Sequence, residues 1–283
     1  LLWISTLART LLSRCIPLYL SMEKIMKLKS KLLLALLATS SAAFAQTAPA
    51  APETTIAYNV GVVSEYRYRG IAQTKGDPAL QGGVDYTNAN GFYLGAWGST
   101  IKWIKDSAHS ASSAQTKGPV ELDLYGGYKF EAAGIGYDVG YLRYQYAGNT
   151  LANNTTDKLV NANTDEVYGA ATYGVTTLKY SYAFSNLFGN PDSKGSVYWD
   201  LSANFDLGNG YSFVPHAGHQ TIRNNANGYT DLALTLNKDF GEGLVGTVSA
   251  ISTNGKGKSA LASYLTTYDT AKNAVVVGVK YSF

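Results

Sequence analysis

The chain ends in Ala274-Val-Val-Val-Gly-Val-Lys-Tyr-Ser-Phe283, where large apolar residues alternate with small or polar ones. The large side chains are Val275, Val277, Val279, Tyr281 and Phe283. Successive residues of a strand point to opposite faces, so these five form one continuous apolar face. A strand that is apolar on one face and ends on an aromatic residue is typical of the last strand of an outer-membrane β-barrel. We expect these five residues to be the signal that the barrel-assembly machinery reads.

Eleven further segments with period-two patterning precede this one, separated by turn or loop residues. The predicted strands are 58–69, 79–87, 92–104, 120–130, 135–146, 166–173, 176–186, 196–207, 211–223, 229–239, 244–253 and 271–283. Short turns such as 88–91 and 208–210 alternate with longer loops, of which 105–119, 147–165 and 254–270 are the longest. This alternation is typical of outer-membrane barrels, in which the long loops are external. We predict an all-β fold, a 12-stranded antiparallel up-and-down transmembrane β-barrel.

The two faces of each segment differ in polarity. In 196–207, Trp199, Leu201 and Ala203 share one face, whereas Asp200 and Ser202 share the other. A soluble barrel would turn its apolar face inward around a core. Here the polar face is too charged for a lumen-free core, and the export signal described below favours a barrel with a polar interior and an apolar exterior. Aromatic residues are expected at both membrane interfaces. The periplasmic set is Tyr58, Tyr86, Tyr128, Tyr137, Tyr173, Tyr211 and Phe240, and the outer set is Tyr66, Tyr68, Trp103, Tyr146, Phe184 and Tyr198.

The first 45 residues indicate export. Residues 26–45 combine a basic start, the apolar run Leu32–Leu37 and the small-x-small sequence Ala43-Phe-Ala45, which together predict a signal peptide. We interpret residues 1–25 as an upstream extension, residues 46–55 as a disordered tether and residues 56–283 as the barrel. From residue 46 onward the chain has 17 basic and 19 acidic residues and no cysteine. This excludes disulfides and thiolate metal sites there, and it gives no electrostatic case for nucleic-acid binding.

One stretch near the start of the barrel resembles a known family. It is Ser64-Glu-Tyr-Arg-Tyr-Arg-Gly-Ile-Ala-Gln-Thr-Lys-Gly-Asp-Pro-Ala-Leu-Gln-Gly-Gly-Val-Asp-Tyr86, followed by Gly91-Phe-Tyr-Leu-Gly-Ala-Trp97. It is similar to the opening of the proteobacterial TorF porin family, and weaker likeness continues through 166–169, 229–231 and 238–240. The resemblance implies an outer-membrane barrel and a channel. It transfers no substrate and no catalytic residue.

The alternation also predicts which charges face the lumen. The inward basic residues are Arg67, Arg69, Lys102, Lys179 and Lys280, and the inward acids are Glu65, Asp85, Glu121, Asp123, Asp138, Glu166, Asp200, Asp206 and Asp231. We expect the channel to be lined by Arg67, Arg69, Lys102, Glu121, Asp123, Glu166, Lys179, Asp200 and Asp231. An arc of basic residues would face an acidic arc and create a transverse field with weak cation preference. The alternative is that these charges pair with one another and plug the barrel. In segment 135–146, an inward Asp138 leaves Arg143 outward unless a bulge intervenes.

The sequence carries little catalytic chemistry. His216 and His219 are three residues apart on a predicted strand, so they point to opposite faces and cannot chelate one metal together. We predict no cofactor, no metal site and no enzymatic activity. The expected function is passive diffusion of small polar or charged solutes across the bacterial outer membrane, with membrane lipid and lipopolysaccharide around the barrel. The alternatives are a structural or adhesive barrel with a closed lumen and, less favoured, an outer-membrane hydrolase.

Deletion of Phe283 should strongly lower the amount of folded protein in the outer membrane. The reason is that the terminal aromatic completes the alternating apolar face of the last strand. Immunoblots of outer-membrane fractions, with heat-modifiable migration as the sign of folding, measure the effect. Unchanged folding and abundance would contradict the assignment of residues 275–283 as an assembly signal.

Overall fold

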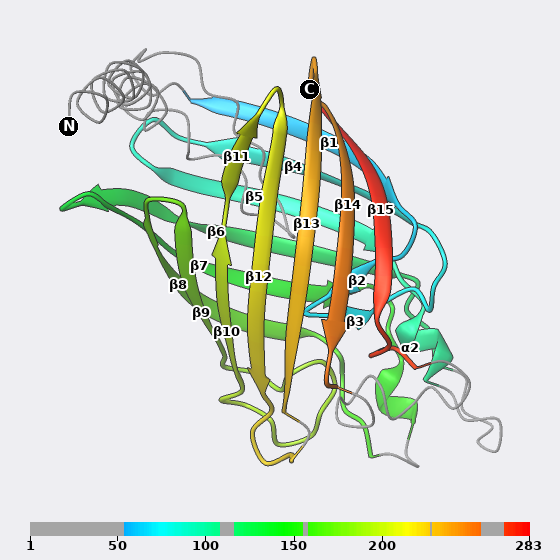
Figure 1. Cartoon of the computed structure of the whole chain (residues 1–283). Coiled ribbons are helices and arrows are strands. Elements are labelled where there is room, and N and C mark those ends of the chain that lie inside the picture. Colours follow the sequence, from blue (N-terminus) through cyan, green and yellow to red (C-terminus); the bar gives the residue numbers. More distant parts are fainter. Residues whose placement is uncertain (1–53, 108–115, 155–157, 227, 256–268) are drawn as a thin grey trace, which may run out of the picture.

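The computed structural model describes residues 54–107, 116–154, 158–226, 228–255 and 269–283. The predicted leader and most of the predicted tether lie outside these ranges. Within them, twelve antiparallel wall strands form a closed barrel (Figure 1). We call these wall strands staves, and we count β10 and β11 together as one stave. The staves are β1 (Thr55–Val63), β4 (Ala79–Thr87), β5 (Phe92–Thr100), β6 (Val120–Ala132), β7 (Ile135–Tyr146), β8 (Thr164–Tyr173), β9 (Thr176–Ala183), β10 (Val197–Ala203) with β11 (Phe205–Gly208), β12 (Tyr211–Thr221), β13 (Tyr229–Gly241), β14 (Leu244–Thr253) and β15 (Ala274–Ser282).

Each stave pairs with its neighbours in chain order, and β1 pairs with β15 to close the ring. At this seam the backbone N–H groups of Tyr58 and Phe283 each donate to the carbonyl oxygen of the other, both at 2.9 Å. The start of β1 and the end of β15 therefore lie together, at the end of the barrel that carries the short turns. We call this the turn end and the opposite one the loop end. The loop end holds the shorter elements β2 (Arg67–Tyr68), β3 (Ile71–Ala72), α2 (Trp103–Asp106) and η1 (Leu151–Asn153).

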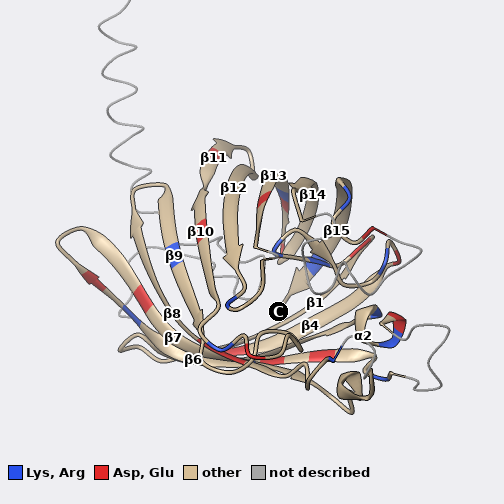
Figure 2. Cartoon of the chain, turned by 90° about the horizontal axis from the view of Figure 1, so that it is seen from below, with Lys and Arg blue, Asp and Glu red and all other residues tan. Residues whose placement is uncertain are grey.

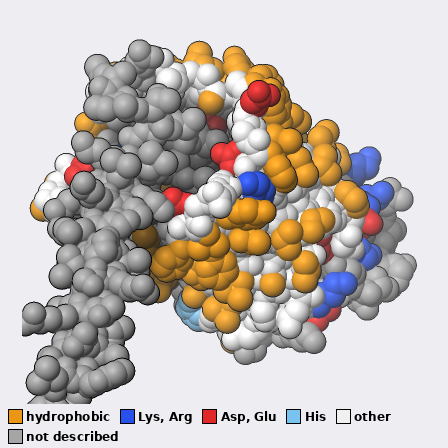
Figure 3. Space-filling view, turned by 45° about the horizontal axis from the view of Figure 1, so that its top comes forward, with side chains coloured by type: hydrophobic (Ala, Val, Ile, Leu, Met, Phe, Trp, Pro, Cys, Tyr) orange, Lys and Arg blue, Asp and Glu red, His pale blue; other side chains and the backbone are white. Residues whose placement is uncertain are grey.

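The polarity of the two barrel faces follows the sequence alternation. Apolar side chains of the staves point outward and are exposed, for example Leu234 at 55%, and hydrophobic groups cover large parts of the outer surface in Figure 3. The five alternating residues of the C-terminal segment, Val275 to Phe283, are all exposed on this outer face. An apolar exterior around a polar interior is the arrangement of a barrel that spans a membrane. Among the described residues, no helix has the length and apolarity needed to cross a membrane.

Four lumen tyrosines pack on glycines of an adjacent stave. Tyr125 covers Gly95, Tyr93 covers Gly127, Tyr168 covers Gly140, and Tyr198 covers Gly218; a Cβ added at any of these glycines would overlap the tyrosine. Because glycine has no side chain, each tyrosine ring can lie directly against the backbone of the neighbouring stave. Such cross-strand aromatic–glycine pairs fix the register of neighbouring strands.

The predicted strands agree closely with the observed staves, with three differences. Segments 79–87, 135–146 and 244–253 coincide with β4, β7 and β14. The predicted strand 196–207 is interrupted at Asn204, between β10 and β11. The register places Asn204 opposite Val214 of β12, next to Pro215, which has no N–H to donate to a neighbouring stave.

The other two differences concern chain that leaves the wall. The predicted strand 58–69 ends as β1 at Val63, because residues 64–72 turn into the barrel. The predicted strand 92–104 ends as β5 at Thr100 and continues into α2. In a strand, Trp103 and Ile104 would point to opposite faces, whereas the helical turn buries both in the same apolar cluster.

The outward position of Arg143 is confirmed, and it needs no bulge. Asp138 points into the lumen, while Arg143 lies on the outer face near the loop end. There it forms an ion pair with Asp165 of β8 at 2.9 Å, and Tyr141 also donates to Asp165 at 2.6 Å. A paired charge at the rim of the barrel is far less costly than one at the centre of a bilayer.

Replacement of Gly95 by Ala should destabilise the barrel by about 1–3 kcal/mol, the usual cost of overpacking. The added methyl group would overlap the Tyr125 ring. Gly169→Ala on β8 is the matched control, because no atom lies within 4 Å of the position of its Cβ. The temperature at which the folded band is lost in heat-modifiable electrophoresis measures both. Equal temperatures for the two variants would show that Tyr125 does not pack on Gly95 in the folded barrel.

Candidate functional site

The loop-end half of the lumen is filled by a segment of the chain itself. Beyond β1, the chain folds back between the walls, and β2 and β3 form a hairpin inside the barrel (Figure 1). Ile71 and Ala72 of this hairpin are 1% and 0% exposed. We call residues 65–72 the plug hairpin, because its side chains contact β6, β8 and β12 from within.

Arg69, at the tip of the plug hairpin, makes the strongest contact with the wall. Its guanidinium group donates to both carboxylate oxygens of Glu166 on β8, at 3.0 and 2.7 Å, and to Gln220 Oε1 on β12, at 2.8 Å. Burial is the largest single effect on Arg69 and works against its charge, but Glu166, Tyr68 and Tyr144 together outweigh it, so the pKa of Arg69 is raised well above its ordinary value. Bidentate pairs of this kind are both strong and specific in direction.

A second ion pair holds the base of the hairpin. Arg67 Nε donates to Glu65 at 2.6 Å, and Arg67 Nη1 donates to the carbonyl oxygens of Gly70, Thr270 and Lys272 at 3.1, 3.1 and 2.8 Å. Two of these carbonyls belong to the segment that leads into β15. Arg67 therefore connects the hairpin by hydrogen bonds to a segment near the C-terminal end of the chain.

Two tyrosines of the plug hairpin reach polar groups of the wall. Tyr66 donates to Glu121 Oε1 of β6 at 2.7 Å, and Tyr68 forms a hydrogen bond with Tyr144 of β7. Tyr144 in turn donates to Glu166 at 3.2 Å. Burial, reinforced by the Glu121 carboxylate, raises the pKa of Tyr66 well above its ordinary value, so Tyr66 remains a neutral donor throughout the physiological pH range.

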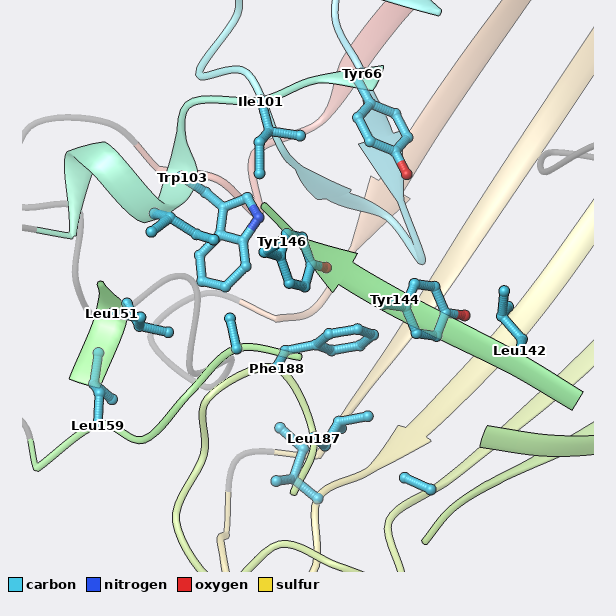
Figure 4. Packing of buried hydrophobic residues seen from close by; sticks show 14 of the residues in the cluster. Tyr66, Ile101, Trp103, Leu142, Tyr144, Tyr146, Leu151, Leu159, Leu187 and Phe188 are labelled. Atoms are coloured by element: carbon cyan, nitrogen blue, oxygen red, sulfur yellow. The ribbon is translucent and has the colours of Figure 1, made fainter. Parts of the chain in front are cut away.

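An apolar cluster packs at the loop end beside this hairpin (Figure 4). Its rings meet edge to face: the centroids of Trp103 and Tyr146 are 5.3 Å apart, and those of Tyr144 and Phe188 are 5.1 Å apart. The remaining labelled members are Tyr66, Ile101, Leu142, Leu151, Leu159 and Leu187. Because these residues come from several different connections and staves, the cluster packs the connections of the loop end and the plug hairpin into one unit.

A polar group lies next to Arg69 on β10, β12 and β13. His216 Nδ1 is 3.2 Å from Asp200, and His216 Nε2 is 2.8 Å from Asp231. Tyr198 also donates to Asp231, at 3.0 Å. Both ring nitrogens of His216 thus face carboxylates, and neither is free to act as a base toward a hydroxyl nucleophile. His219, as predicted, points to the other face and contacts Thr230 at 2.9 Å.

The turn-end half of the lumen is polar and more open. Asp85, Lys129, Asp138 and Lys280 all point inward there and are only partly buried. Tyr93 donates to Asp138 at 2.6 Å. Ionisable groups therefore continue along the lumen from the turn end to the plug hairpin. Within the described ranges, no group of three or more histidine, cysteine or carboxylate residues is placed to hold a metal ion.

Six of the nine residues predicted to line a channel lie on inward faces of staves: Glu121, Asp123, Glu166, Lys179, Asp200 and Asp231. Figure 2 shows acidic positions on β6, β8 and β10 and a basic position on β9 when the ring of strands is viewed from the loop end. That these residues contact a permeating solute remains a prediction.

The other three predicted residues lie elsewhere. Arg67 and Arg69 belong to the plug hairpin and not to a wall strand. Lys102 precedes α2 and is paired with Asp77 at the rim, where both side chains are about half exposed. The predicted basic arc therefore does not exist as a part of the wall: Arg69 is in direct contact with an acidic wall residue, Glu166. The placement of the outer aromatic set was wrong except for Phe184. Tyr66 and Tyr68 lie in the plug hairpin and Trp103 in α2, so these three have left the wall. Tyr146 and Tyr198 do lie on wall strands, β7 and β10, but both are buried and point inward.

Sequence reasoning missed the wall partners of Arg69. Gln220 and Tyr198 were not singled out as site residues, although both have the inward parity of their staves. The Arg69-Gly70 pair was the available signal for a tight turn, because glycine at the second position allows the positive φ of a two-residue hairpin. Here both residues have positive φ, 46° and 76°.

Residues 46–283 match the profile of a bacterial family described as "Bacterial protein of unknown function (Gcw_chp)". No curated protein matches the sequence.

Several solved outer-membrane proteins are similar to this chain in structure, at low sequence identity. A KdgM porin in complex with disordered oligogalacturonate is 11% identical, with 81% of this chain and 98% of that chain covered and a TM-score of 0.49. The NanC porin is 10% identical over 81% and 98% of the two chains, with a TM-score of 0.47. Outer membrane phospholipase A from Escherichia coli, in an active-site mutant form, is 16% identical over 84% and 94%, with a TM-score of 0.43. At these levels of similarity we take neither solute nor activity from them.

Glu166→Gln should loosen the plug hairpin, because it leaves the buried Arg69 guanidinium without its counter-charge; breaking such a pair costs about 3–5 kcal/mol. A cysteine at Ala72 reports this, since that position is fully buried and the chain after residue 45 has no other cysteine. We expect maleimide to label Ala72→Cys faster when Glu166→Gln is present.

Asp165→Asn is the matched control for this experiment. Asp165 is the neighbouring residue and also pairs with an arginine, but on the outer face of the barrel. It should leave the labelling rate at position 72 unchanged. Equal rates in the Glu166→Gln and Asp165→Asn backgrounds would mean that the Arg69–Glu166 pair does not hold the hairpin in place.

Proposed function

The chain belongs to the bacterial Gcw_chp family, and we propose that it is an outer-membrane channel for the passive diffusion of small polar or charged solutes, narrowed at its loop end by the plug hairpin. The observation that carries the proposal is the closed barrel with an apolar exterior and a lumen lined with ionisable groups. A purely structural barrel can fill its interior with apolar side chains. Charged groups along the lumen instead keep it hydrated and favour passage of polar solutes.

The turn-end half of the lumen supports this proposal more directly than the loop-end half. Asp85, Lys129, Asp138 and Lys280 are only partly buried, so water can reach charged groups in this half of the lumen. The lumen also remains acidic on balance. Away from the turn-end rim, its charged wall residues in the described ranges, together with Arg69 of the hairpin, are the acids Asp85, Glu121, Asp123, Asp138, Glu166, Asp200 and Asp231 and the bases Arg69, Lys129, Lys179, His216 and Lys280. An acidic surplus favours cations.

A second candidate is a structural or adhesive barrel with a closed lumen. The specific observation in its favour is the burial of Ile71 and Ala72 of the plug hairpin, with Ile71 packed against Tyr229 and Ala271. The two candidates differ in one respect, which is whether ions cross the folded barrel. We propose no hydrolase, because both nitrogens of the lumen histidine, His216, are taken by carboxylates.

The proposed surroundings follow from the same architecture. Outer-membrane lipid and lipopolysaccharide would contact the apolar exterior, and the barrel-assembly machinery would act on the C-terminal strand. The TorF porin family, which the stretch 64–86 resembles, fits this setting.

Planar-bilayer recording tests the channel. We expect the wild-type barrel to conduct weakly, and a variant in which residues 65–77 are replaced by a short Gly-Ser turn to conduct several-fold more, because the hairpin fills the loop-end half. In a KCl gradient, the reversal potential should show cation preference. Clear anion preference would contradict the acidic lumen. A variant that migrates as a folded barrel and still carries no current would favour the closed-lumen candidate.

A further inference from the structure

The tip of the plug hairpin is held by the wall in the way that a binding site holds a ligand. We infer that Glu166, Gln220 and Tyr198 form a guanidinium-binding site in the barrel wall, which Arg69 occupies in this structure and which a guanidinium-bearing solute takes when Arg69 withdraws. The binding site itself rests on contacts of the wall. Its use for a permeating solute rests on the proposed channel function.

The polar contacts match a planar guanidinium group. Arg69 Nη1 and Nη2 reach the two oxygens of Glu166, and Nη1 also reaches Gln220 Oε1 at 2.8 Å. Two parallel N–H donors facing two carboxylate oxygens are a geometry that a guanidinium can meet and an ammonium cannot. The site therefore distinguishes the shape of a cation as well as its charge.

Aromatic rings surround the same cation. The central carbon of the guanidinium lies 4.3 Å from the ring centroid of Tyr198, 5.0 Å from that of Tyr68 and 5.9 Å from that of Phe188. All three are within the range of cation–π attraction, which is stronger where water is excluded. Tyr198 belongs to the wall strand β10, so this ring remains in place if the hairpin moves.

The wall residues are positioned by partners other than Arg69. The Gln220 amide nitrogen donates to the carbonyl oxygens of Val197 and Thr221, at 3.1 and 3.0 Å, which turns its oxygen toward the lumen. The Tyr198 hydroxyl is fixed by Asp231, and its ring packs on Gly218. A site whose groups are already oriented binds its ligand at a lower entropic cost.

The surroundings have capacity for positive charge beyond Arg69. Asp123 on β6 is only 3% exposed, and its Oδ1 atom is buried with no hydrogen-bond partner in the described part of the chain. The charges that act on it are those of Glu121, Glu166 and Arg69. A buried acceptor without a partner is costly unless a ligand or ion satisfies it. A cation with several N–H donors is suited to do so.

Turn geometry does not explain the arginine. The two-residue turn Arg69-Gly70 has positive φ at both positions, which is the turn that favours Asn-Gly. Arginine at the first position is unfavourable for the backbone, so its side-chain contacts are the reason for its presence. This gives a clean variant, because Arg69→Asn removes the guanidinium and improves the turn.

Isothermal titration calorimetry of the folded full-length barrel with methylguanidinium chloride tests the inference. We expect Arg69→Asn to bind methylguanidinium saturably and about tenfold more tightly than wild type, in which the site is occupied. Methylammonium should bind Arg69→Asn more weakly, since it cannot make the bidentate contact. Adding Glu166→Gln should abolish the gain, whereas adding the control Asp165→Asn should preserve it.

The folded state of each variant is checked by heat-modifiable migration, and Arg69→Gly replaces Arg69→Asn if the latter does not fold, because glycine also accepts positive φ. Two results would overturn the inference: a folded Arg69 variant that binds methylguanidinium no better than wild type, or one that binds methylammonium equally well. Calorimetry needs no current. If the folded barrel binds methylguanidinium but never conducts, the binding site is supported and the channel function is contradicted. If it conducts but does not bind methylguanidinium, the channel function is supported and the binding site is contradicted.

Discussion

The hydrogen-bonded seam between β1 and β15 is the constraint on which the rest of the structure depends. Lipid offers no partner to a backbone N–H or carbonyl, so a sheet that crosses a membrane must leave no open edge. Pairing Tyr58 with Phe283 closes the ring. Once the ring is closed, each stave has a fixed register, and the alternation of its residues decides which side chains meet lipid and which enter the lumen.

Closure creates a second problem, which is the interior. A ring of twelve staves is wider than the eight-stranded barrel that wall side chains can fill. Two devices address this here. Tyrosines such as Tyr93 and Tyr168 lie against glycines on neighbouring staves and thicken the wall in the turn-end half. The plug hairpin and the apolar cluster around Trp103 fill the loop-end half. The lumen is therefore polar and more open in its turn-end half and packed with side chains in its loop-end half.

Sequence alternation was sufficient to predict the staves and the face to which each residue points. The reason is that a strand with lipid on one side and a polar lumen on the other has apolar and polar residues in strict alternation. It could not place residues 64–72, since an alternating segment continues equally well as a wall strand or as a hairpin inside the barrel. For that reason Arg67, Arg69, Tyr66 and Tyr68 were assigned to the wall. The partners of Arg69 were also beyond reach: Glu166 and Gln220 are 97 and 151 residues away in sequence. Only the order and register of the staves bring them to one place.

The buried ion pair of Arg69 and Glu166 is not the most stable way to hold the plug hairpin in the lumen permanently. Replacing a buried ion pair by apolar side chains of similar volume is often neutral or stabilising, by up to about 4 kcal/mol, because the charges no longer lose their hydration. Apolar residues were available, since Leu187 and Phe188 already pack beside the hairpin. An ion pair differs from an apolar contact in what can replace it: water and a competing cation can satisfy Glu166 once the hairpin leaves, whereas nothing polar can compensate an exposed apolar surface. The choice of charge at the tip therefore favours a plug hairpin that can be displaced, and it places the selectivity of that displacement in the wall residues that hold Arg69.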